Sequence, residues 1–171
     1  MLFRSNVNFQ INQGDRIVLN GQNGCGKSSI LKLLWGDNIE YSGEIIKNNQ
    51  LKISYIPQDT SFLYGSLTEY AENHQIDESL FKTILRKLDF SRTQLEKNIE
   101  NLSAGQRKKV LISGSLCQQA HLYIWDEPLN YIDIFSRMQI EQLLLTFKPT
   151  LLFVEHDKQF QDNIATKIIQ I

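Results

Sequence analysis

The sequence has almost no excess of charge of either sign. Its 171 residues include 18 Lys and Arg against 19 Asp and Glu, which leaves a net charge of −1. A chain that attracts nucleic acid or an anionic membrane through its overall field needs a clear positive excess. Any such partner would have to be held by a local patch. The apolar content of 42% and charged content of 22% are those of a globular protein, which excludes a disordered chain or a coiled-coil rod.

Long hydrophobic runs and paired cysteines are lacking as well. No stretch approaches eighteen apolar residues, and the start MLFRSNVNFQ has no signal-peptide core. We therefore expect a cytoplasmic protein without direct membrane insertion. Cys25 and Cys117 lie far apart without metal-ligand spacing, which argues against a disulfide framework and a zinc site.

The sequence also has no internal repeat, low-complexity tract or linker-like stretch. Its length is enough for one core but too short for two full-sized domains, so we expect one domain over residues 1–171. Strand patterns alternate with helix patterns, which predicts an α/β fold with a mostly parallel sheet covered on both faces. Strands are expected at 7–11, 16–20, 44–46, 51–56, 122–125, 150–155 and 167–171, and helices at 29–35, 103–118, 134–147 and 158–163.

Between these strands the pattern changes to helical spacing. Residues 67–99 show no strand signal, and Leu80, Ile84, Leu85 and Leu88 form a candidate buried stripe. We predict a small helical lobe over about 66–118.

The segment GQNGCGKS at 21–28 has phosphate-loop spacing and lies between a predicted strand and a predicted helix. Glycines let the backbone curl around an anion, and the helix that follows directs its positive end at it. Lys27 would neutralise phosphate charge and the Ser28 hydroxyl would bind Mg²⁺. The alternative is a fortuitous glycine turn.

A second candidate site feature is the end of the apolar segment LYIWDE at 122–127. An acidic residue at such a strand end supports Mg²⁺ in phosphate-loop enzymes, and Asp126 fits that part. Glu127 would orient the attacking water or accept its proton. Taken alone, two carboxylates at a strand tip can equally be surface charges.

The segment LSAGQ at 102–106 is typical of a helix N-terminus, where Ser103 caps and Gly105 leaves the first turn open to an anion. The basic run that follows, Arg107-Lys108-Lys109, allows two interpretations. It could contact RNA phosphates, or it could be a solvated helix face, which we favour.

These motifs in this order, with Gln58 after Tyr55-Ile56-Pro57 and His156 after an apolar strand, resemble the nucleotide-binding domain of the ATP-binding cassette (ABC) superfamily over essentially the whole chain. The resemblance implies a P-loop NTPase three-layer core with a small antiparallel N-terminal β-sheet. It also implies Mg²⁺-dependent ATP hydrolysis, weak or absent in an isolated domain, because two domains must meet head to tail around ATP.

The resemblance also implies roles for individual residues. Glu127, His156 and Gln58 are the catalytic candidates, and Ser28, Gln58 and Asp126 would serve Mg²⁺. Nucleotide-binding candidates are Gly21, Asn23, Gly24, Cys25, Gly26, Lys27, Ser28 and Ser29, with Ser103, Gly105 and Gln106 serving the nucleotide of the opposing domain.

Within the superfamily, DEPLNYID at 126–133 and Glu155-His156-Asp157 resemble the ABC-F proteins, in particular the second ATPase domain of antibiotic-resistance proteins that protect the ribosome. Two other functions stay open: the ATP-binding subunit of a membrane transporter, and a non-hydrolysing binding module. The chain departs from the family pattern in two places. Ala104 stands where glycine is usual, and the first strand with its adenine-stacking aromatic is missing, which suggests an excised domain.

Overall fold

The computed structural model describes residues 7–171, which divide into two compact units. The sheet unit comprises the described residues up to Tyr55 together with Ala120–Glu127 and Phe147–Ile171. The helical unit comprises Ile56–Gln119 and Pro128–Thr146. No helix between residues 7 and 171 combines the length and hydrophobicity that a bilayer crossing requires.

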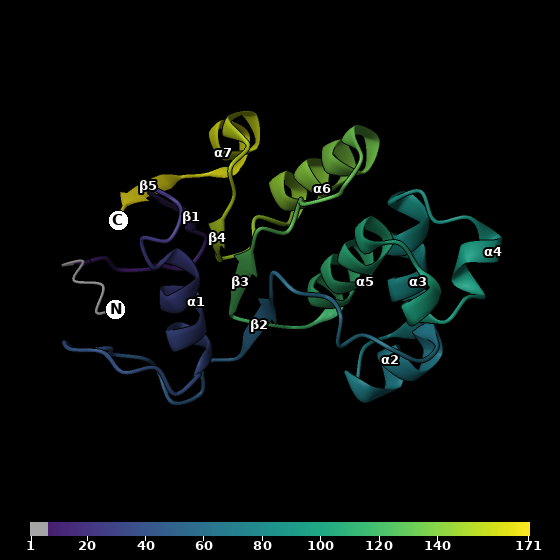
Figure 1. The fold of residues 1–171 in the computed structure, drawn as a ribbon, viewed down its shortest axis with the longest axis horizontal. Helices are drawn as coiled ribbons and strands as arrows, with labels where there is room; N and C mark the ends of the chain where they lie inside the picture. Colours follow the sequence, from purple (N-terminus) through teal and green to yellow (C-terminus); the bar gives the residue numbers. More distant parts are fainter. Residues whose placement is uncertain (1–6) are drawn as a thin grey trace. The chain divides into compact units, whose positions relative to one another are not determined.

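A five-stranded sheet forms the centre of the sheet unit, in the order β2-β3-β4-β1-β5 (Figure 1). The pairs β1–β4, β1–β5 and β3–β4 are parallel, which confirms the expected parallel arrangement. The strands are β1 (Arg16–Asn20), β2 (Ile53–Ile56), β3 (Leu122–Asp126), β4 (Leu151–Val154) and β5 (Lys167–Gln170).

Helices cover both faces of this sheet. All four residues of β4 are buried, and their side chains alternate between the faces. Leu152 and Val154 pack in one cluster with Leu31 of α1 (Lys27–Trp35). Phe153 points the other way and meets Phe160 of α7 (Lys158–Ile164) edge-on, with ring centroids 5.7 Å apart. The α/β three-layer architecture is therefore confirmed.

The helical unit is built from short capped helices around α5 (Ala104–Cys117). Its other helices are α2 (Leu67–Asn73), α3 (Glu78–Lys87), α4 (Arg92–Leu95), a 3₁₀ turn (Ile99–Asn101) and α6 (Ile134–Phe147). A serine or aspartate side chain caps the N-terminus of α2, α3, α4 and α5, so local hydrogen bonds set where these helices begin.

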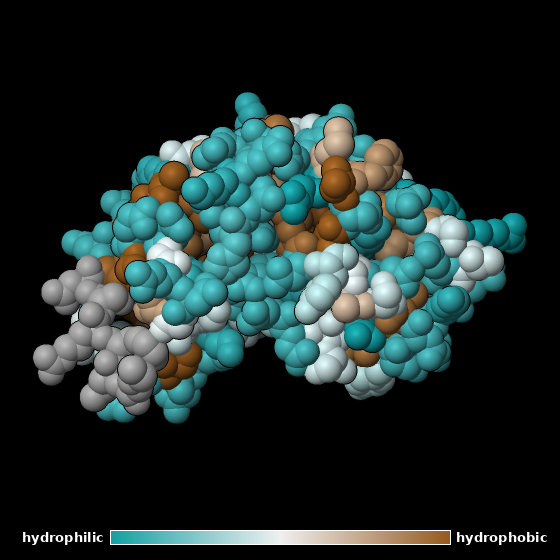
Figure 2. Space-filling model, turned by 45° about the horizontal axis from the view of Figure 1, so that its top comes forward, coloured by the Kyte–Doolittle hydropathy of each residue, from teal (hydrophilic) through white to brown (hydrophobic). Residues whose placement is uncertain are grey.

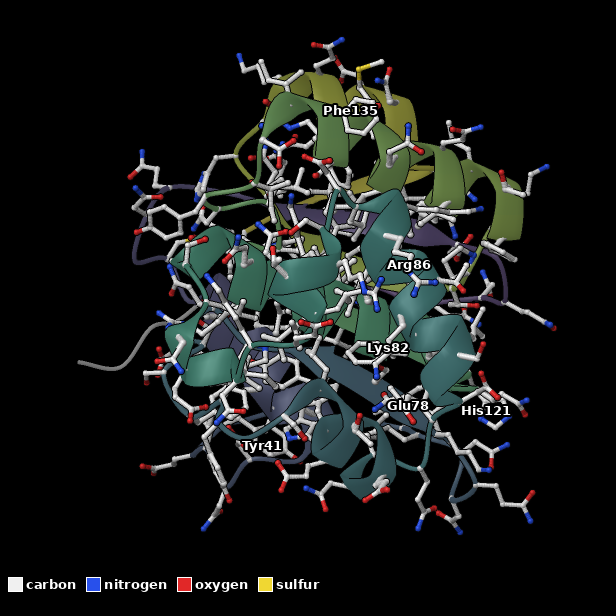
Figure 3. The ribbon with its side chains drawn as sticks, turned by 90° about the vertical axis from the view of Figure 1, so that its right-hand side faces the viewer. Tyr41, Glu78, Lys82, Arg86, His121 and Phe135 are labelled. Carbon is white, nitrogen blue, oxygen red and sulfur yellow. The ribbon has the colours of Figure 1, made fainter. Side chains whose placement is uncertain are left out.

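The two faces of α3 differ in character. Figure 3 shows Glu78, Lys82 and Arg86 along the helix, where their spacing of four places them on one side. Lys82 forms an ion pair with Glu78 there. Phe81 and Leu85 are buried on the other side.

On the space-filling surface, apolar groups form small patches among hydrophilic ones (Figure 2).

Two expectations about the fold are wrong. Residues 7–12 and 44–46 form no strand, so the small antiparallel N-terminal sheet is absent from residues 7–171. Alternating polarity shows which residues favour an extended backbone, but a strand also needs a partner with which to exchange hydrogen bonds. In α3, Leu80 is 48% exposed and Phe81 is buried instead, while Ile84, Leu85 and Leu88 of the expected stripe are buried as predicted.

Candidate functional site

The loop between β1 and α1 has the backbone conformation that its glycines were expected to allow. Gly24 has φ +79° and Gly26, the N-cap residue of α1, has φ +104°, a region that other residues rarely adopt. Gly26 supplies no side-chain cap, so no capping side chain satisfies the first N–H groups of α1. This loop and the helix N-terminus fit an anionic ligand.

Lys27 is buried, with 7% of its surface exposed, and its amine bends back over the loop. Nζ donates to the carbonyl oxygens of Gly21 at 2.8 Å and of Gln22 at 2.9 Å. Both acceptors are neutral, so the positive charge is hydrogen-bonded but not neutralised. A buried, uncompensated ammonium favours the arrival of an anion.

Ser28 and Asp126, which are 98 residues apart in sequence, meet in the sheet unit. The Ser28 hydroxyl donates to Oδ1 of Asp126 at 3.1 Å. Asp126 ends β3 and is 1% exposed. Hydroxyl and carboxylate oxygens are ligands that suit Mg²⁺, so these two residues fit the metal expected here.

Glu127 and His156 also come together. His156 Nε2 lies 3.1 Å from Oε1 of Glu127. The Glu127 backbone has φ +47°, and its N–H donates to the carbonyl of Val154 in the neighbouring strand at 3.0 Å. A left-handed conformation at a glutamate is strained, and such strain concentrates at functional sites.

Tyr55 lies beside this group without belonging to it. Burial raises the pKa of Tyr55 to about 12, and the negative charges of Asp126 and Asp37 add to that shift. Its ring stacks on the ring of Trp35, with the two ring centroids 5.5 Å apart. The tyrosine is therefore part of the packing of α1 against β2.

The remaining loop candidates of the sheet unit line the same turn. Asn23, Gly24 and Ser29 are exposed, and Cys25 is half-buried. The N–H of Cys25 donates to the carbonyl of Gln22 at 3.3 Å and closes the turn.

The other predicted site residues belong to the helical unit. Ser103 caps α5 as expected: its Oγ accepts from the N–H of Gln106 at 3.2 Å, while Oε1 of Gln106 accepts from the N–H of Ser103 at 2.9 Å. Gln58 is exposed just after Pro57. The roles of Ser103, Gln106 and Gln58 at a nucleotide stay predictions.

A neighbouring segment fills the side-chain position of Gly105. A Cβ at this position would lie 2.2 Å from the carbonyl oxygen of Tyr131. The main chain of the segment before α6 therefore occupies the space that the absent side chain leaves. This glycine is required for close packing, which no local sequence signal reveals.

The basic run of α5 contradicts both interpretations drawn from the sequence. Lys108 is 1% exposed and donates to the carbonyl of Pro57 at 2.9 Å. Lys109 is 7% exposed, and its Nζ lies 2.7 Å from Oδ2 of Asp133. Arg107 donates to the carbonyl of Leu102 at 3.1 Å. The two lysines face the interior of the helical unit, so they form neither a solvated face nor a surface for RNA.

Asp133 is a residue that the sequence reasoning missed. Partial burial raises its pKa, but hydrogen bonds from Lys109 and from the backbone and hydroxyl of Ser136 outweigh that effect and hold the pKa well below its usual range. Ser136 also donates to the carbonyl of Leu88 at 3.1 Å, which ties α6 to the end of α3. The spacing Asp133-x-x-Ser136 before an apolar helix is an N-cap signal that could have found it.

Comparisons with known proteins agree with this geometry. The chain is 33% identical to the ATP-binding protein Uup of Buchnera aphidicola subsp. Acyrthosiphon pisum over 92% of its own length and 28% of that protein. It is 29% identical to ABC transporter F family member 2 of Arabidopsis thaliana, covering 26% of that protein. The chain thus spans less than a third of these two relatives.

Among solved structures, the fold matches an archaeal ribosome recycling factor, aABCE1, crystallised with the ribosomal stalk protein aP1. The TM-score is 0.80 and the identity 28%, over 94% of this chain and 32% of that one. Residues 4–130 match the family described as ABC transporter. This match covers most of the chain and includes both the phosphate loop and the acidic strand end, and on this evidence the chain belongs to the ABC transporter family as an ATP-binding cassette.

Proposed function

We propose that this chain binds Mg²⁺-ATP at the phosphate loop of its sheet unit and hydrolyses it when a second cassette domain completes the site. The observation that carries the proposal is the convergence, within one unit, of an uncompensated buried lysine with a hydroxyl–carboxylate pair. The proposal rests on these contacts and on the family of the chain.

The loop residues bind the triphosphate. Lys27 exchanges its two carbonyl acceptors for phosphate oxygens, which neutralise its charge. Backbone N–H groups of the turn and of the first turn of α1 supply the remaining donors. The residues concerned are Gly21, Asn23, Gly24, Cys25, Gly26, Lys27, Ser28 and Ser29.

Ser28 and Asp126 hold Mg²⁺, and Gln58 of the helical unit is the further residue proposed to serve it. When bound, the ion neutralises charge on the phosphate oxygens. The existing contact between the Ser28 hydroxyl and Asp126 keeps both oxygens together before the ion arrives.

Glu127 orients the attacking water and accepts its proton. His156 holds the Glu127 carboxylate through its Nε2 and contacts the terminal phosphate. Catalysis is thus mainly positioning and charge stabilisation. Ser103, Gly105 and Gln106 act on the nucleotide of the opposing domain, which makes a lone domain a weak or inactive ATPase.

The decisive experiment compares ATP binding with ATP hydrolysis in wild type and Glu127→Gln. We expect the variant to bind Mg²⁺-ATP with an affinity close to that of wild type, because the phosphate-binding groups are intact. Hydrolysis, measured as phosphate release in the presence of a partner cassette, should fall by about 10² to 10⁴-fold, the usual contribution of a general base.

Two outcomes would contradict this assignment. Normal turnover by Glu127→Gln would remove the proposed role of the carboxylate. Binding without phosphate release by wild type, even with a partner domain present, would favour the non-hydrolysing module.

A finer proposal concerns the partner. We propose that the cassette acts on the ribosome, in the manner of ABC-F proteins that protect it from antibiotics. The support is the likeness to a family F member and to a recycling factor solved with a ribosomal stalk protein. Sedimentation of Glu127→Gln with ribosomes in ATP, followed by drug-resistance assays in cells, tests both steps. Recovery with a membrane complex instead would favour the transporter subunit.

A further inference from the structure

Glu155 is a buried acid that the proposed chemistry does not use. It directly follows β4, directly precedes His156, and is only 6% exposed. Burying a carboxyl group is costly unless hydrogen-bond donors meet it. Its presence beside the site therefore requires a physical reason.

One partner of the Glu155 carboxylate is the peptide group between Glu155 and His156. Its N–H, which belongs to His156, donates to Oε1 of Glu155 at 3.0 Å. Its carbonyl, which belongs to Glu155, accepts a hydrogen bond from Nε2 of Gln161. Buried side chains thus hold both polar atoms of a single peptide plane, and the plane cannot rotate without breaking two hydrogen bonds.

Gln161 is itself firmly placed. It lies on α7 and is 8% exposed. Asp157 caps this helix by accepting from the N–H of Phe160 at 2.8 Å, and the Phe160 ring packs on Phe153 of β4. The cap fixes where α7 begins, and the ring contact anchors this helix to β4.

The orientation of this peptide is one of the factors that set the direction in which the His156 side chain leaves the backbone. Half of that side chain is exposed to solvent, so packing alone does little to hold the ring. The ring nevertheless lies 3.1 Å from the Glu127 carboxylate. We propose that Glu155 and Gln161 are positioning residues: they hold the 155–156 peptide plane and thereby direct the His156 imidazole at Glu127. This inference rests on the proposed roles of Glu127 and His156 and adds two residues to that site.

The first test uses the 171-residue chain without nucleotide, labelled with ¹⁵N. Glu155→Met removes the acceptor at similar size, Glu155→Gln restores an acceptor oxygen, and Gln161→Met removes the donor to the carbonyl. Gln159→Met, at an exposed position on the same helix, is the matched control. The readouts are hydrogen exchange of the His156 amide and the ring Nε2 chemical shift, with His74 and His121 as internal references.

We expect the His156 amide to exchange about tenfold faster or more in Glu155→Met, since the hydrogen bond from this amide to the Glu155 side chain is lost. The ring signal should move toward its value in Glu127→Ala, in which the partner carboxylate is missing. Glu155→Gln should restore both readouts, Gln161→Met should shift the ring signal, and Gln159→Met should change neither. Unchanged ring signals in folded Glu155→Met and Gln161→Met would overturn the proposal. If Glu155→Met fails to fold, Gln161→Met alone decides.

A second measurement separates this inference from the proposed function. With a partner cassette, Gln161→Met should lower kcat about tenfold and leave KM for ATP within about twofold, because positioning of a reacting group acts on the chemical step. A wild-type chain that fails to bind ATP overturns the proposed function, while the ring readout still stands. A shifted ring signal with unchanged kcat would overturn the positioning role alone.

Discussion

Two buried lysines, Lys27 in the sheet unit and Lys109 in the helical unit, have different partners. In the sheet unit, Lys27 donates to two neutral carbonyl oxygens of its own loop. In the helical unit, Lys109 meets the carboxylate of Asp133. The first amine keeps a charge that an anionic ligand can neutralise, whereas the second has its charge compensated inside the fold. The same residue type is therefore proposed to bind ligand in one unit, and it holds structure in the other, according to its partners.

The strongest way to break this comparison is Lys27→Ala. We expect the affinity for Mg²⁺-ATP to fall by about 10² or more, because charge-assisted bonds to the phosphates are each worth about 1.5–3 kcal/mol. Lys32→Ala, at an exposed position on the same helix, should bind as wild type does. Titration calorimetry measures both, and undiminished binding by Lys27→Ala would show that the buried amine is structural, like Lys109.

A glycine in the helical unit supplies the next test. Replacing an unconstrained helical glycine with alanine stabilises a helix by up to about 1 kcal/mol. In Gly105→Ala the new Cβ would lie 2.2 Å from the Tyr131 carbonyl, so we expect a loss of about 1–3 kcal/mol in the free energy of unfolding. Urea unfolding gives the sign directly, with Ala104→Gly as the neighbouring control. A gain in stability would mean that Gly105 is not packed against Tyr131.

The ion pair Lys109–Asp133 can be measured by a double-mutant cycle with Lys109→Met and Asp133→Asn. About half of the Asp133 side chain is exposed, so solvent screening reduces the coupling to about 1–2 kcal/mol of unfolding free energy. ATP affinity should stay unchanged, since this pair lies in the helical unit. A coupling near zero would remove the structural half of the comparison.

Acid provides a control for this pair. The folded-state pKa of Asp133 is lowered, so its stabilising effect is present above the pKa of an unfolded aspartate and is lost as pH falls below it. In Lys109→Met, the free energy of unfolding should therefore fall less steeply than in wild type as the pH is lowered.

The smallest expected effect concerns one tyrosine in each unit. Burial raises the pKa of Tyr55 and of Tyr70 to about 12. An unfolded tyrosine ionises near pH 10. The contribution of each buried tyrosine to the free energy of unfolding is therefore fully present below that pH and is lost between about pH 10 and pH 12. Each variant, Tyr55→Phe or Tyr70→Phe, should lose about 1 kcal/mol less unfolding free energy at alkaline pH than wild type does. The difference should be smaller for the half-buried Tyr55 than for Tyr70. Unfolding curves at pH 9 and 11 check it, and an unchanged pH dependence would contradict it.

Much of the sheet unit could be predicted from the sequence. The sequence pointed to Lys27, Ser28 and Asp126 as site candidates. The glycine loop and the apolar strand that contain them are each recognisable from a short stretch of neighbouring residues. The parallel sheet followed from alternating strands and helices. In the helical unit, the Ser103 cap followed from its position before α5. The pairing of Glu127 with His156 required the tertiary structure, since the two residues come from separate strands.

The helical unit was harder to predict. The run Arg107-Lys108-Lys109 has the composition of a solvated face, and nothing near it in sequence shows that Pro57 and Asp133 supply acceptors for the two lysines. The strand expected at 44–46 failed for the same reason, since its formation depends on a partner elsewhere in the chain.

By itself, the sequence determined the phosphate loop, the acidic strand end and the order of most helices and strands, because each depends on residues within a few positions of one another. Only the tertiary structure decided which lysines are compensated, why Gly105 must lack a side chain, and how Glu155 and Gln161 hold the peptide before the His156 ring. The lysine and glycine contacts join segments distant in sequence, and the Glu155 and Gln161 contacts depend on how α7 packs beside β4. Their energy depends on which atoms the fold brings within hydrogen-bond distance.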